Sequence, residues 1–64
     1  MLRADVSEAV NNLIAHAGGK PASWGLYEYA KRSLSYVCGW DAGAKYDQAQ
    51  YDRAIRIVCH AYGL

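Results

Sequence analysis

Cysteine and histidine are the side chains most able to do chemistry in this chain, and two of them, Cys59 and His60, are adjacent near its end. A thiolate beside a base would be a nucleophile, and the same two groups would form half of a zinc site. On a helix, however, adjacent side chains diverge by about 100° and point to different faces. We therefore interpret Cys59 and His60 as two separate residues of a helix.

A metal site would also need His16 and Cys38, which complete a set of two cysteines and two histidines. Their spacing matches neither the CxxC nor the HxxxH pattern of zinc ligands. In an up-down-up bundle Cys38 would end the second helix at one pole, and Cys59 would lie roughly 18 Å from that pole. This separation excludes a four-ligand site and a disulfide between the two. We expect no metal and no cofactor, with both cysteines flanking their helices and both histidines on the surface.

The carboxylates do not suggest an active site either. They stand mostly at positions expected to begin helices or to face solvent: Asp5, Glu8, Glu28, Asp41, Asp47 and Asp52. No two are placed to move each other's pKa apart in a cleft, as acid–base catalysis requires. A chain of 64 residues also has little room for a ligand pocket. We expect a protein that is not an enzyme and has no catalytic residues.

Three amphipathic segments separated by glycines must position these side chains, because apolar residues recur at helical spacing in each of them. The first begins at Asp5, and Glu8 follows at the spacing of a capping box. The second begins either with Pro21 as its first residue or with Ser23 as its cap. The predicted helices cover residues 5–17, 22–38 and 48–62.

The third segment has the strongest start signal. Asp47 is a natural cap, and Gln50 occupies the reciprocal position of a capping box. Tyr46 and Tyr51 have the spacing of a hydrophobic staple. No stretch sustains the alternation of a β-strand. We predict an all-α fold, a small up-down-up three-helix bundle that forms a single domain over residues 1–64.

Charge and hydropathy narrow the classes of function. Seven basic and six acidic residues are interspersed and give a net charge of +1, so the chain lacks the strong excess of a polyanion binder. No apolar run has the length of a signal-peptide core or of the ~20 residues that span a bilayer. Two cysteines far apart do not make a disulfide scaffold. We expect a cytoplasmic protein that does not bind membranes.

The aromatic composition points to an interface. The chain has six tyrosines, two tryptophans and no phenylalanine, so every aromatic ring carries a polar group. With the apolar side of the second helix turned inward, Tyr29 and Tyr36 project from nearly the opposite side, with Arg32 beside them. We predict a partner-binding surface formed by Tyr29, Arg32, Tyr36 and Trp40, which would bind a larger protein or complex, or a second copy in a homodimer. The alternative is that these tyrosines pack on loop residues such as Trp40.

A second function class remains open. Basic residues lie on or near the predicted outer face of the third helix, where they would contact DNA or RNA: Lys45, Arg53, Arg56 and His60. Asp47 and Asp52 interrupt this face, and the connection before the helix is too long for a helix-turn-helix. We therefore predict an adaptor or an inhibitor of a larger complex, of the kind that phage and other mobile elements often encode, with a nucleic-acid-binding regulator as the alternative.

Overall fold

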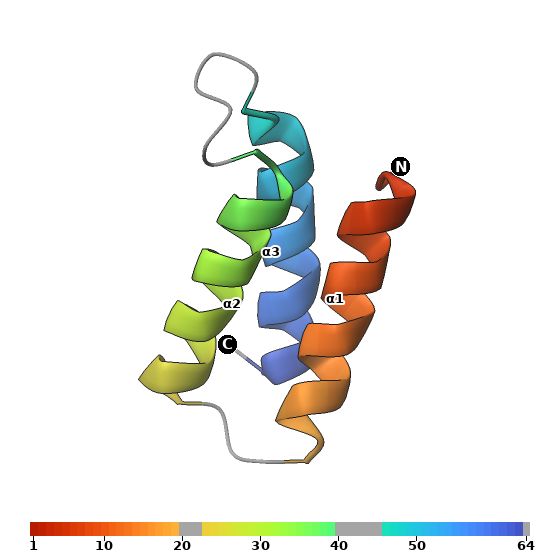
Figure 1. Cartoon of the computed structure of the whole chain (residues 1–64). Coiled ribbons are helices and arrows are strands. Elements are labelled where there is room, and N and C mark those ends of the chain that lie inside the picture. Colours follow the sequence, from red (N-terminus) through yellow and green to blue (C-terminus); the bar gives the residue numbers. More distant parts are fainter. Residues whose placement is uncertain (20–22, 40–45, 64) are drawn as a thin grey trace.

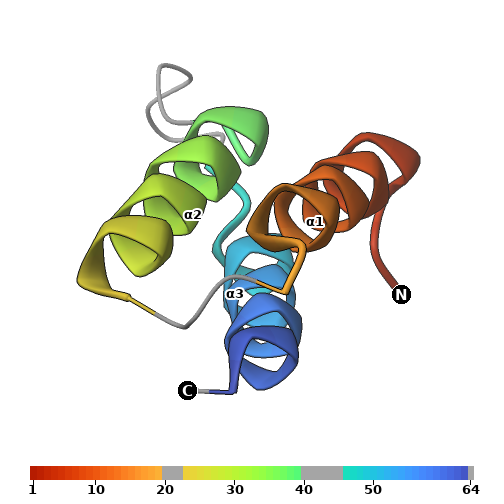
Figure 2. The same ribbon diagram turned by 90° about the horizontal axis from the view of Figure 1, so that it is seen from below.

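The computed structural model of the chain describes residues 1–19, 23–39 and 46–63, which contain three helices and no strand. The helices are α1 (Ala4–Ala17), α2 (Trp24–Val37) and α3 (Gln48–Tyr62). Figure 1 shows that α1 and α3 run in the same direction and that α2 runs against both. Seen from one end, the three axes form a triangle in which each helix packs against the other two (Figure 2). The predicted up-down-up bundle is confirmed, with helix bounds within two residues of those expected.

The core is built from one stripe of each helix. Its buried residues are Val6, Val10, Leu13 and Ala17 of α1, Ala30 and Leu34 of α2, Ala54, Val58 and Tyr62 of α3, and Cys38 directly after α2. The contribution of α2 is the smallest, because only Ala30 and Leu34 of its residues are buried. At the far end of the seam between α1 and α3, the Tyr62 hydroxyl donates a buried hydrogen bond of 3.1 Å to the carbonyl oxygen of Leu13.

The starts of α2 and α3 follow the predicted capping. Ser23 Oγ accepts a hydrogen bond of 3.1 Å from the backbone N–H three residues later, which makes Ser23 the cap of α2. Asp47 Oδ1 accepts the equivalent hydrogen bond of 3.1 Å from the N–H of Gln50. The rings of Tyr46 and Tyr51 lie 6.1 Å apart, as a hydrophobic staple requires.

The start of α1 differs from the prediction. The helix begins one residue early, so its cap is Arg3, and no side chain makes a capping hydrogen bond there. Asp5 lies within the first turn, where its carboxylate accepts a hydrogen bond of 2.8 Å from the N–H of Val6 and suits the positive end of the helix dipole. The capping box predicted for Asp5 and Glu8 is therefore wrong.

A contact between distant parts of the chain replaces that capping box, and we call it the N-terminal clasp, formed by Met1, Arg3, Val37, Asp47 and Gln50. Gln50 Oε1 accepts a hydrogen bond of 2.8 Å from the N–H of Arg3, and Gln50 Nε2 donates one of 2.9 Å to the carbonyl of Met1. The Arg3 guanidinium lies 3.3 Å from Asp47 Oδ2 and donates to the carbonyl of Val37 at 3.2 Å. The clasp thus joins the start of α1 to the end of α2 and the start of α3, and Gln50 is used here rather than in a reciprocal bond to Asp47.

Candidate functional site

Helix α2 carries the exposed aromatic side chains of the described residues, two on its outer side and one at its edge toward α1. Trp24 is 72% exposed, Tyr36 is 73% exposed and Tyr29 is 50% exposed, whereas the other described aromatic residues are partly or fully buried. Because Ala30 and Leu34 occupy the inward positions of α2, three of its four aromatic residues are left on the surface. Trp24 was not among the predicted site residues, because its position in the helical pattern lies partly on the inward face.

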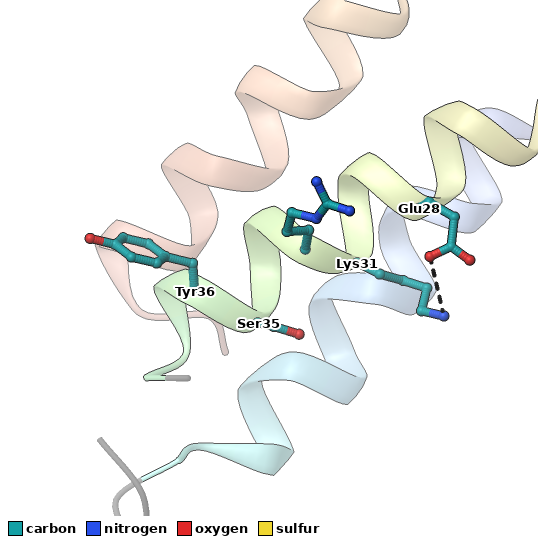
Figure 3. Close-up of a pocket in the computed structure, with 5 residues that line it drawn as sticks. Glu28, Lys31, Ser35 and Tyr36 are labelled. Atoms are coloured by element: carbon teal, nitrogen blue, oxygen red, sulfur yellow. Dashed lines mark ion pairs between the residues drawn. The ribbon is translucent and has the colours of Figure 1, made fainter. Parts of the chain in front are cut away.

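Two of the predicted partner-binding residues, Arg32 and Tyr36, line one open groove of about 440 Å³ together with Glu28, Lys31 and Ser35. Figure 3 shows Tyr36 extending away from Lys31 and Ser35, toward the other flank of α2. Lys31 Nζ lies 3.8 Å from Glu28 Oε2, and no described carboxylate lies within 4.0 Å of the Arg32 guanidinium. The groove therefore has one aromatic wall and a net positive charge.

Tyr29 belongs to a different part of the surface. Its ring centroid lies 5.1 Å from that of His16 in α1, and it lines a smaller groove of about 190 Å³ between α1 and α2. Tyr29 therefore stands at the edge facing α1 rather than opposite the core, and the structure does not bring it into the groove of Arg32 and Tyr36. Trp40, the fourth predicted residue, lies outside the described residues.

A second open groove continues the aromatic surface at the start of α2. It has a volume of about 440 Å³ and is lined by Ser23, Trp24, Tyr27 and Cys59, so it extends from α2 to α3. The Trp24 and Tyr27 rings lie 5.7 Å apart, and Lys31 Nζ stands 5.1 Å from the centroid of the Tyr27 ring. Such aromatic and cation–π contacts hold the rings in place on the surface.

The cysteines and histidines form no chemical site in the part of the chain that the structure describes. Both thiols are free: Cys38 is buried in the core, not on a flank as predicted, while Cys59 is half-buried. Burial raises the pKa of the Cys38 thiol and so keeps it protonated, although the nearby Arg3 opposes this effect. Within the described ranges no three His, Cys, Asp or Glu side chains are grouped as a metal ion would need.

The alternative basic face lies on α3. Arg53, Arg56 and His60 are all exposed there, and Lys45 lies outside the described residues. Asp52 is exposed on the same helix and accepts a hydrogen bond of 2.8 Å from Gln48 Nε2. This face thus mixes both signs of charge, as the sequence predicted.

The arrangement can bind a surface, since its grooves are open and its exposed groups are aromatic and cationic. Among the described residues, no helix has the length and apolar character needed to cross a lipid bilayer. Comparisons of the chain with protein-family models, with curated proteins and with solved structures found no match.

Proposed function

We propose that this chain is a non-enzymatic, cytoplasmic protein-binding module that docks on a larger protein or complex through the outer side of α2, as an adaptor or an inhibitor. The observation that carries the proposal is the concentration of exposed aromatic side chains, Trp24, Tyr29 and Tyr36, on one helix. Tryptophan, tyrosine and arginine supply much of the binding energy at protein interfaces. The two free cysteines support a reducing compartment such as the cytoplasm.

The construction of α2 favours binding without rearrangement. The helix is capped by Ser23 and held by the buried Ala30 and Leu34, so a partner does not have to order its backbone. Covering the exposed part of a ring such as that of Tyr36 is worth about 2 kcal/mol. The Tyr36 ring and the Arg32 guanidinium in one groove, with the exposed rings of Trp24 and Tyr29 elsewhere on α2, would give a specific interface.

Affinity capture tests this proposal. We expect the wild-type chain to retain a partner from a lysate of its source cells, and the double variant Tyr29→Ala/Tyr36→Ala to lose it. The matched control, Arg53→Ala/Arg56→Ala, replaces two exposed residues of α3 and should retain the partner. Circular dichroism should show equal helicity for all three proteins. Equal capture by the wild type and the tyrosine variant would remove the outer side of α2 from consideration.

A second candidate function, nucleic-acid binding, rests on the exposure of Arg53, Arg56 and His60 along α3. If these residues contact phosphates, the affinity for DNA or RNA should fall steeply as salt concentration rises. Replacing Arg53 and Arg56 by alanine should flatten this dependence. The absence of any mobility shift of DNA or RNA at low salt would exclude this function.

A further inference from the structure

Four residues of α2 form one row along its outer side: Trp24, Glu28, Arg32 and Tyr36, each four positions after the last. Side chains at this spacing make a continuous ridge on a helix. Each step along the row turns by about 40°, so Glu28 and Arg32 mark its centre and the two aromatic residues flank it at about 60° on either side. Trp24 and Tyr36 are 72% and 73% exposed, and Arg32 is exposed.

The row is complementary to a second copy of itself that runs in the opposite direction. If a second α2 is laid antiparallel across the first at the oblique angle of about 50° that aligns the i, i+4 rows of two helices, with the two-fold axis at the level of Ala30, Trp24 of each copy faces Tyr36 of the other. In the same register each Glu28 faces the other copy's Arg32. The two aromatic pairs would lie roughly 18 Å apart along the helix, on either side of two opposite-charge pairs.

We infer that α2 pairs with α2 of a second copy of this chain, antiparallel and with a two-fold axis at the level of Ala30. The charges select this orientation, because a parallel pair would place Glu28 against Glu28 and Arg32 against Arg32. In an isologous interface every contact occurs twice, so both the attraction of the antiparallel pair and the repulsion of the parallel pair are doubled.

The structure leaves the central charges available for such pairing. No described carboxylate lies within 4.0 Å of Arg32, and the present partner of Glu28 is Lys31 at 3.8 Å, a solvent-exposed pair of little strength. In the proposed complex, the aromatic pairs at both ends would shield the charges from water.

Small residues on the same side permit close approach. In this register Gly25 faces the other copy's Ser35, so small residues of the two helices meet. A Cβ atom placed on Gly25 would find only Ser23 Oγ, at 3.8 Å, and otherwise open space. The space above Gly25 can therefore receive a side chain of the second copy.

This inference goes beyond the proposed function and can fail separately from it. The dimer forms from the pure chain, whereas the proposed function requires another protein. Tyr29 stands beside His16 rather than in the row, so Tyr29→Ala should weaken capture of another protein and leave the dimer intact. Because Arg32 and Tyr36 belong to both surfaces, the second copy and the other protein compete for α2.

Sedimentation equilibrium of the pure chain over a range of concentrations is the test. We expect the mass to rise from 7.1 kDa toward twice that value as concentration increases. Glu28→Arg and Arg32→Glu should each weaken self-association by about tenfold or more, because each creates two like-charge contacts. The double variant Glu28→Arg/Arg32→Glu should recover it. An equimolar mixture of the two single variants should form a heterodimer, since every central contact then pairs opposite charges.

The matched control is Arg56→Glu, which makes the same change of charge on α3 and should leave self-association unchanged. A wild-type chain that stays at 7.1 kDa at every concentration would overturn the inference. The inference would also be overturned if the double variant and the mixture associated as weakly as the single variants. The same holds if Arg56→Glu weakened self-association as much as Arg32→Glu does. All substitutions are at exposed or half-exposed positions, and circular dichroism checks that each variant is folded.

Discussion

Gln50 joins the first residues of the chain to the start of α3 through both atoms of its amide group. Its oxygen accepts from the N–H of Arg3 and its nitrogen donates to the carbonyl of Met1, at 2.8 and 2.9 Å. These hydrogen bonds satisfy backbone groups before the first turn of α1, which have no partner within that helix. One side chain of α3 thereby does for α1 what a local cap does elsewhere.

Replacing Gln50 by alanine should lower the free energy of unfolding by roughly 1 kcal/mol, because two partly exposed hydrogen bonds are lost. Urea unfolding measures this change. Gln48→Ala is the matched control, since it removes from the same helix an amide whose bond is to the neighbouring Asp52 at 2.8 Å. That control should cost no more than about 0.5 kcal/mol. Equal losses in both variants would show that the N-terminal clasp does not stabilise the fold.

The two thiols should differ in reactivity, since Cys38 is 1% exposed while Cys59 is half-buried on the wall of an open groove. A thiol reagent such as Ellman's reagent should modify Cys59 in the native protein and Cys38 only when the chain unfolds. The variant Cys59→Ser should lose the fast phase, and Cys38→Ser should keep it. A fast reaction of Cys38 in the native state would contradict its placement in the core.

At the scale of the helix, α2 has the fewest buried residues of the three described helices, so its cap contributes a measurable part of its stability. Ser23→Ala removes the hydrogen bond of 3.1 Å that Ser23 Oγ accepts from the backbone N–H of Leu26. We expect a loss of about 1 kcal/mol. This corresponds to a decrease in Tm of roughly 4–8 °C for a domain of this size.

Thermal unfolding followed by circular dichroism measures that decrease. Ser23→Asp is the control, because an aspartate caps a helix about as well as a serine and should preserve the Tm. If the alanine and aspartate variants melt at the same temperature, the side-chain cap does not stabilise α2.

Helices whose start signals are local could be predicted from the sequence. The caps Ser23 and Asp47 each bond to a backbone N–H three residues away, so a short stretch of sequence is enough to recognise them. The start of α1 was predicted incorrectly because its partner, Gln50, is 47 residues distant from Arg3. Spacing within the helix cannot reveal such a contact.

The candidate site was predictable only in part, for the same reason. Helical spacing correctly placed Arg32 and Tyr36 on the outer side of α2, since the angle between residues of one helix is fixed. It did not predict the contact of Tyr29 with His16, or the exposure of Trp24, because both depend on how α2 lies against α1 and α3. The burial of Cys38 likewise depends on packing beyond the end of its helix.

For the whole molecule, three groups among the described residues link stability to alkaline pH. Burial raises the pKa of Cys38 above its ordinary value of 9.0, and that of Tyr51 and Tyr62 above 10.0. The fold thus favours the protonated forms, and the unfolded chain loses these protons at lower pH than the folded one does. Their contribution to stability is complete below pH 9 and is lost as pH rises through the folded-state pKa values.

The midpoint of urea unfolding should therefore be constant from about pH 7 to 9 and decrease above that range. With Tyr62→Phe the midpoint should fall less steeply above about pH 9. This variant also lowers the free energy of unfolding at pH 7 by about 1 kcal/mol, because the hydrogen bond from the Tyr62 hydroxyl to the Leu13 carbonyl is lost. Tyr36→Phe removes the hydroxyl of an exposed tyrosine and should leave the stability at pH 7 unchanged. A midpoint that is unchanged up to about pH 11 would contradict the assignment of buried, protonated groups.

The parallel course of α1 and α3 also decides how the molecule would respond to mechanical force. The described chain begins at one pole and ends near the other (Figure 1), and the seam between α1 and α3 is fastened near both, by the N-terminal clasp and by the bond from Tyr62 to Leu13. Tension applied through the two ends would load this seam in shear, so that its contacts resist together instead of peeling apart one by one. Since α2 packs against both neighbours and the N-terminal clasp includes the carbonyl of Val37, α2 would share part of this load.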